Sequence, residues 1–140
     1  MIRGIKAVLL LFFLPFIFFA HEFNPAHLVV KEVDTNIYET KWMYPVKNIG
    51  ARGEVVFPNE CLRENTNIEK NGRYLVESFS LTCATSIKGK TINVRSLSVL
   101  TDALITVNHL DATNFEGLMN SKNPFIEIPL KEQIYPTGYF

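Results

Sequence analysis

The chain has 140 residues, of which 47% are hydrophobic, 12% aromatic and 20% charged, and its formal net charge is zero. This length fits a single domain, and the apolar content excludes an intrinsically disordered chain. The balanced charge gives no electrostatic reason to expect nucleic acid as a partner.

Residues 1–20 are predicted to be a secretory signal peptide. Arg3 and Lys6 form a short positive region, and an apolar run from Ala7 to Phe19 follows, ending at the small residue Ala20. The run is 13 residues long, whereas a helix that crosses a bilayer needs about 20. We therefore expect an exported, periplasmic protein whose signal is removed.

Cleavage after Ala20 would make His21 the new N-terminus. One residue departs from the usual cleavage pattern, because Phe18 stands where a small residue is normal. The alternative is therefore an uncleaved anchor that extends over residues 5–20.

Hydrophobic and polar side chains mostly alternate in the rest of the chain, which is typical of half-buried strands. In one stretch Tyr38, Thr40 and Trp42 point one way, while Glu39 and Lys41 point the other. Strands are predicted near residues 27–33, 37–45, 53–57, 73–83, 90–95, 103–109 and 124–128.

Turn residues separate the predicted strands. The pair Asn71-Gly72 predicts a tight hairpin with a type I′ turn, because both residues tolerate positive φ. About seven short strands without a long helical pattern indicate an all-β fold, an antiparallel immunoglobulin-like β-sandwich over residues 21–129. The alternation is lost after Pro129, and residues 130–140 are predicted to be a connector.

The chain has two cysteines, Cys61 and Cys83. An even count in an exported chain predicts a disulfide, because the periplasm is oxidising. Two separate buried thiols are the alternative. Cys83 lies on the apolar face of its predicted strand and is expected to point into the core.

No phosphate loop, nucleophile elbow or metalloprotease motif occurs in the sequence, and we expect a non-enzymatic protein. Trp42, Tyr44 and Phe79 are aromatic residues that could line a pocket. An aromatic stripe at strand spacing more often belongs to the core, because such side chains bury large areas.

A metal site is the sharpest chemical hypothesis. An N-terminal His21 would offer its amino nitrogen and its imidazole to one Cu(II) or Ni(II) ion, and Glu22 and His27 could add ligands. This layout resembles exported copper carriers of the CopC kind. The alternative is that the three histidines, His109 included, are structural or surface residues that bind no metal.

Landmarks along the chain resemble the exported N-terminal domain of the HupE/UreJ family of membrane proteins. Ala20-His-Glu-Phe-Asn-Pro25 is similar to the family's opening after the signal, and Tyr38-Glu-Thr-Lys-Trp42 resembles its second strand. Phe57-Pro-Asn-Glu-Cys61 and Leu81-Thr-Cys83 are similar to its cysteine-bearing segments, and Pro124-Phe-Ile-Glu-Ile-Pro129 to its closing strand.

The resemblance implies an accessory or interaction domain at the outer face of the inner membrane, beside the helices of a nickel-transporting permease. Two departures limit what it implies. Asn24 stands where the family usually has a basic residue. Family members continue from a segment like Tyr135-Pro-Thr-Gly-Tyr-Phe140 into membrane helices, so the expected partner is a set of permease helices or another membrane protein. A copper- or nickel-binding carrier centred on His21 is the alternative function.

Overall fold

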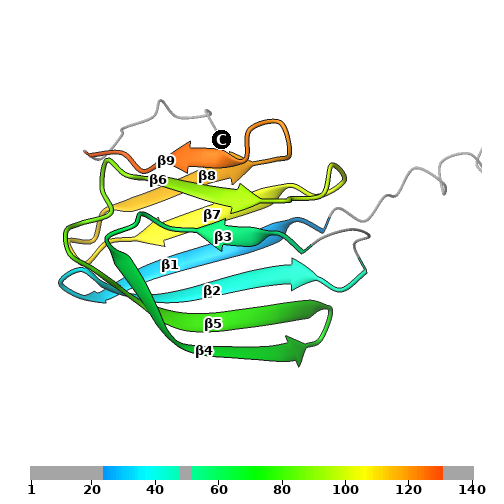
Figure 1. The fold of residues 1–140 in the computed structure, drawn as a ribbon, viewed down its shortest axis with the longest axis horizontal. Helices are drawn as coiled ribbons and strands as arrows, with labels where there is room; N and C mark the ends of the chain where they lie inside the picture. The colour runs from blue at the N-terminus through cyan, green and yellow to red at the C-terminus, as the bar shows by residue number, and fades with distance from the viewer. Residues whose placement is uncertain (1–23, 48–51, 131–140) are drawn as a thin grey trace, which may run out of the picture.

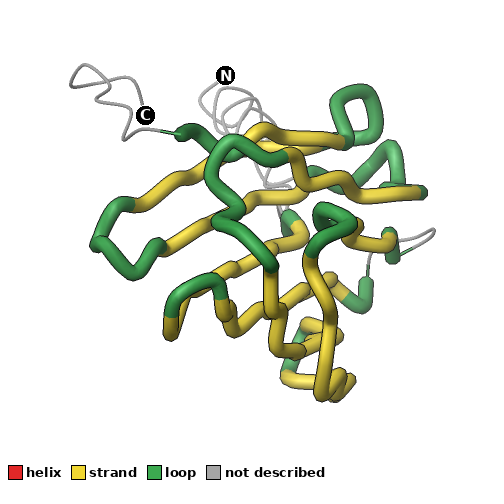
Figure 2. Tube along the Cα trace, turned by 60° about the vertical axis from the view of Figure 1, so that its left-hand side comes forward, coloured by secondary structure: helices red, strands yellow, loops and turns green. Residues whose placement is uncertain are grey.

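The computed structural model describes residues 24–47 and 52–130, and these residues form strands and loops without a helix (Figures 1 and 2). They make nine strands in two sheets. The strands are β1 Ala26–Asp34, β2 Ile37–Pro45, β3 Glu54–Val56, β4 Cys61–Asn71, β5 Tyr74–Cys83, β6 Thr91–Arg95, β7 Ala103–Asn108, β8 Asn114–Met119 and β9 Phe125–Glu127.

The larger sheet has six strands in the order β4-β5-β2-β1-β7-β8, and the smaller sheet has the order β3-β6-β9. In Figure 1 the smaller sheet lies in front of the larger one, and β4 and β5 extend beyond its β3 edge. The all-β, sandwich-like fold predicted from the sequence is confirmed.

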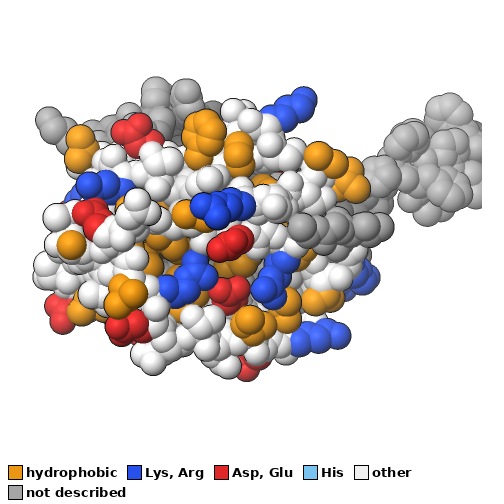
Figure 3. All heavy atoms as spheres, in the orientation of Figure 1, with side chains coloured by type: hydrophobic (Ala, Val, Ile, Leu, Met, Phe, Trp, Pro, Cys, Tyr) orange, Lys and Arg blue, Asp and Glu red, His pale blue; other side chains and the backbone are white. Residues whose placement is uncertain are grey.

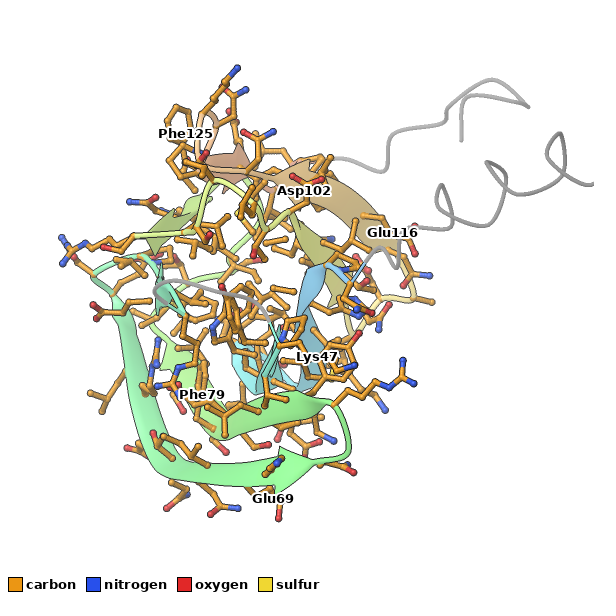
Figure 4. The ribbon with its side chains drawn as sticks, turned by 90° about the vertical axis from the view of Figure 1, so that its right-hand side faces the viewer. Lys47, Glu69, Phe79, Asp102, Glu116 and Phe125 are labelled. Carbon is orange, nitrogen blue, oxygen red and sulfur yellow. A yellow bond between two sulfur atoms is a disulfide. The ribbon has the colours of Figure 1, made fainter. Side chains whose placement is uncertain are left out.

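Period-two alternation builds the core between the sheets. Leu28, Tyr38, Trp42 and Ile105 are at most 2% exposed, and they lie on the face of the larger sheet that meets Ile92 of the smaller sheet. The opposite face of the larger sheet carries the polar residues of the same strands. Figure 4 shows this for Phe79, which points into the molecule, and for Glu69 and Glu116, which point outward.

Each of the seven predicted strands has a counterpart whose limits agree within one or two residues. Two strands were not predicted, β4 and β8. Both are edge strands of the larger sheet, and most of their side chains are exposed or half-buried. An edge strand needs fewer apolar residues, so the polar sequence of β4 carries no alternation signal.

The predicted antiparallel arrangement is wrong for one pair of strands. β1 and β7 are parallel, from Ala26 beside Ala103 to Lys31 beside Asn108. Parallel neighbours need a long crossover connection. The chain between these two strands passes through both sheets, which is a long-range arrangement that local alternation cannot reveal.

The predicted hairpin exists, but its turn is shifted by one residue. Asn71 pairs with Tyr74 in the ladder, so the two turn residues are Gly72 and Arg73. Gly72 has a φ of 60°, whereas Arg73 does not have a positive φ. This is the pattern of a type II′ turn, which needs glycine only at its first central position.

The predicted disulfide is present. Cys61 and Cys83 face each other across β4 and β5, with their Cα atoms 4.0 Å apart. Cys83 is 5% exposed and belongs to the core, as expected. The bond fastens the beginning of the edge strand β4 to the end of β5.

Several predictions lie outside the described residues. These are the signal peptide or anchor within residues 1–20, the metal ligands His21 and Glu22, and residues 131–140 of the connector. Within the described ranges there is no helix long and apolar enough to cross a membrane.

Gly117 in β8 lies where the edge of the larger sheet approaches β9. A Cβ atom at this position would collide with Cδ1 of Ile126 and would lie 3.3 Å from Cγ2 of Ile105. We expect Gly117→Ala to lower the free energy of unfolding by about 1 kcal/mol, because core overpacking is destabilising. Urea denaturation measures the loss.

Ile126→Val provides the matched control, because valine lacks the colliding methyl group. Gly117→Ala should cost less stability in the Ile126→Val background than in the unchanged protein, and the remaining cost comes from Phe115 and Ile105, whose nearest atoms would lie 3.1 and 3.3 Å from the new Cβ. Equal losses from Gly117→Ala in the two backgrounds would contradict the steric explanation.

Candidate binding groove between the sheets

A groove opens where the smaller sheet ends at β3 and the strands β4 and β5 continue. It consists of two adjoining hollows, of about 380 and 400 Å³, which share Glu54, Val55 and Arg63 in their walls. Figure 3 shows acidic and basic side chains close together over the middle of this face, with hydrophobic atoms between them. Hollows of this size fall within the range of small-molecule and peptide side-chain pockets.

Arg63 is the centre of the groove. Its Nη1 donates to Oε1 of Glu77 at 2.8 Å, and its Nη2 donates to the backbone oxygen of Val55 at 2.7 Å. Its Cζ lies 4.0 Å from the ring centroid of Phe79 and 5.7 Å from that of Phe57. One side chain thus joins β4 to β5 and to the free edge of β3, and it forms cation–π contacts in the gap between the sheets.

The carboxylate of Glu77 also lies near a second positively charged side chain, that of Arg52. Nη2 of Arg52 lies 3.7 Å from Oε2 of Glu77, so the carboxylate stands between two guanidinium groups. The side chain of Glu77 is 15% exposed, and that of Arg63 is 30% exposed. Less water screens the attraction between Arg63 and Glu77 than in an exposed surface pair, and loss of one partner would leave the other charge partly buried and uncompensated.

The strands explain why these polar side chains meet inside the sandwich. Glu77 is in phase with Phe79 and Leu81 on β5, so it faces inward, and Arg63 is in phase with Cys61 on β4. A bulge between Glu64 and Asn67 breaks the register of β4 with β5. In Figure 1 β4 bends along its length, and its first residues lie near β3.

Trp42 closes the inner wall of the groove. It is 2% exposed and lines the larger hollow, yet its indole Nε1 has no hydrogen-bond partner among the described residues. A buried N–H without an acceptor costs about 1–3 kcal/mol. A buried water molecule would recover part of this free energy. The prediction that Trp42 and Phe79 are core residues is confirmed, and both also line the groove.

Of the three predicted metal ligands, only His27 lies in the part of the chain that the structure describes. His27 lies on β1, and its Nε2 is 2.9 Å from the hydroxyl oxygen of Thr106 on β7. Burial lowers the pKa of His27, and the nearby Glu116 acts in the opposite direction. Residues 24–47 and 52–130 contain no group of three or more His, Cys, Asp or Glu residues that could hold a metal ion.

The metal-carrier hypothesis therefore depends on His21 and Glu22, and it stays a prediction. Its test is a titration of the processed protein with Cu(II) or Ni(II), next to a variant with one extra residue before His21. Tight binding that is lost on extension would support a carrier.

The imidazole of His109 is buried, and we expect it to make the stability of the protein depend on pH. It is 8% exposed, and its Nδ1 has no partner in the described part of the chain. Burial lowers the pKa of His109 below its usual 6.5; Lys88 lowers it further, whereas Asp111 and Glu32 raise it. The folded state therefore favours the neutral ring, and the unfolded chain takes up the proton first as the pH falls.

We expect the melting temperature to fall as the pH decreases through 6.5 toward the lowered folded-state value. Calorimetry at pH 7.5 and pH 5.5 tests this, with His109→Gln as the variant that cannot titrate. The variant should lose less stability between the two pH values than the unchanged protein does, and equal losses would count against this role of His109.

Comparison with protein-family models gave no match for the chain, and comparison with curated proteins gave no similar sequence. The groove residues Arg63, Glu77 and Arg52 were not predicted from the sequence. One signal was present, because Glu77 is a carboxylate at an inward-facing position of a predicted strand. No such signal marked Arg52 or Arg63. These residues come close to Glu77 only through the placement of β3 and β4, and β4 was not predicted.

Proposed function

We propose that this chain is a non-enzymatic, exported accessory domain that binds a segment of a membrane protein in the groove between its sheets. The observation that carries the proposal is the groove itself, which charged side chains of both signs line together with the half-exposed Ile68 and the buried aromatic residues Trp42 and Phe79. The Cys61–Cys83 disulfide supports export, because such bonds persist in oxidising compartments.

The walls of the groove suit a peptide segment. Ile68 offers exposed apolar surface, and Arg52 and Glu54 offer charges of both signs. Pockets of this kind derive affinity from apolar contact and orientation from a few polar groups. The resemblance to the HupE/UreJ exterior domain favours a partner from a nickel-transport unit at the outer face of the inner membrane.

Site-specific photo-crosslinking in exporting cells tests the proposal with the full chain. The crosslinking amino acid is placed at Ile68, which lines the groove and is 49% exposed. The matched control is Leu62, which is 62% exposed and lies on the same strand, where it pairs with Thr82 on the outer face.

We expect a discrete adduct with a membrane protein from position 68, none from position 62, and loss of the adduct in Arg52→Glu. No adduct at position 68, or equal adducts from both positions, would overturn the proposal.

A further inference from the structure

The loop between β6 and β7 presents two apolar side chains at the tip of an ordered turn. The N–H of Thr101 donates to the oxygen of Ser98 at 3.0 Å, and the N–H of Leu100 lies 3.3 Å from the hydroxyl oxygen of Ser98. This turn places Val99 and Leu100 at its two central positions. They are 82% and 79% exposed, the highest values for large hydrophobic side chains in the described chain.

Buried residues flank the turn on both sides in the chain. Leu97 is 7% exposed and Thr101 is 2% exposed, so the chain enters and leaves the core on either side of the tip. Central positions of turns usually carry Gly, Pro, Asn, Asp or Ser. Single exposed hydrophobic residues are ordinary, but two adjacent ones on a fixed turn present a small apolar surface to whatever lies against this end.

The position of the turn indicates what covers it. The N–H of Ala26 donates to the oxygen of Asp102 at 2.8 Å, so β1 begins directly beside this loop. The apolar run that ends at Phe19 is separated from Ala26 by six residues, which span at most about 20 Å. A bilayer that holds this run, before cleavage or as an anchor, therefore lies within reach of Val99 and Leu100.

Other side chains at this end suit the surface of an anionic bilayer. Hydrophobic side chains are visible at the right-hand end of the molecule in Figure 3, beside the end where β1 begins in Figure 1. Val46 follows β2 at this end and is 45% exposed, Lys47 comes next, and the N–H of Val46 donates to the oxygen of Arg73 at 2.9 Å, so two basic residues lie at this end together with the acidic Asp102. Figure 4 looks at this end of the molecule, with Lys47 and Asp102 labelled. Apolar insertion together with basic residues is the usual basis of reversible attachment to anionic lipids.

We propose that the Val99–Leu100 turn is a membrane-contacting tip, whose two side chains enter the headgroup region of an anionic bilayer. Two side chains bury too little area for permanent attachment. Their role is to orient the domain on the membrane, so that the beginning of β1 and the β6–β7 loop face the lipid. This inference does not depend on what binds in the groove between the sheets.

A fluorescence experiment on the full chain tests the tip. Leu100→Cys and Leu62→Cys are each labelled with an environment-sensitive NBD group, which is selective because the two native cysteines are paired. Leu62 is a matched control, since it is an exposed leucine at the beginning of β4, whereas the tip lies at the end where β4 finishes. The labelled proteins are mixed with vesicles of phosphatidylcholine and phosphatidylglycerol, with and without lipid-attached spin labels.

We expect a blue shift and spin-label quenching at position 100, no change at position 62, and a smaller shift at position 100 when Val99→Ser is added. The absence of a shift at position 100, or equal shifts at both positions, would overturn the proposal. A shift at position 100 that follows protein concentration without lipid would assign this surface to a second copy of the chain instead. The experiment needs no partner protein, so its failure is distinct from failure of the groove proposal.

Discussion

Removal of the Cys61–Cys83 disulfide is expected to lower the free energy of unfolding by about 3 kcal/mol. The two cysteines are 22 positions apart, and the bond restricts the unfolded chain by closing this loop. The bond also lies at the open end of the β4–β5 hairpin, far from the turn at Gly72. Without it, the edge strand β4 keeps mainly its hydrogen bonds to β5, because most of its side chains are exposed.

Urea denaturation of three samples measures this effect: the oxidised protein, the same protein reduced, and the Cys61→Ala/Cys83→Ala variant. The reduced protein keeps both sulfur atoms, so it separates the cross-link from the packing of Cys83 in the core. Two free thiols in denatured, non-reduced protein would show that the cysteines do not pair.

Arg63→Ala is expected to be the second largest loss, about 2 kcal/mol, because it leaves two partly buried acceptors without their donor. These acceptors are the carboxylate of Glu77 and the backbone oxygen of Val55. The substitution also removes the cation–π contact with Phe79. The edge strand β3 would lose its bond to β4, and the groove would widen at its centre.

A double-mutant cycle with Glu77→Gln isolates the ion pair from the rest of this effect. We expect Arg63→Ala to be less damaging in the Glu77→Gln background, because the uncompensated charge is then absent. Arg63→Lys is the control for charge, since lysine lacks the planar fork that reaches two acceptors at once. Additive losses for Arg63 and Glu77 would mean that the pair contributes no coupling energy.

The strands in which apolar and polar residues alternate could be predicted from the sequence, and the polar edge strand β4 could not. Tyr38, Thr40 and Trp42 alternate with polar residues because one face of β2 meets the core. β4 has only half-buried or exposed residues, so its polar sequence shows no alternation that would predict a strand. Its bulge also depends on contacts with β5, which no local pattern contains.

The side-chain pairs in the groove also could not be predicted from the sequence. Glu77 lies at an inward-facing position of β5, and a carboxylate there needs a partner. Which partner it finds depends on the register between β4 and β5 and on the approach of β3. Residues far apart in sequence meet only after both sheets are packed, so their pairing follows from the tertiary structure.

The parallel pairing of β1 with β7 also determines the order in which the domain can fold. β1 forms first on the ribosome, yet its place in the sheet is between β2 and β7, and Ala26 meets Ala103 only after the intervening strands have been made. Closing so long a loop is entropically costly, and sheets with many non-local contacts fold slowly. The edge of β1 that faces β7 can therefore be paired only after residues 103–108 have been synthesised, so the larger sheet cannot be completed before then.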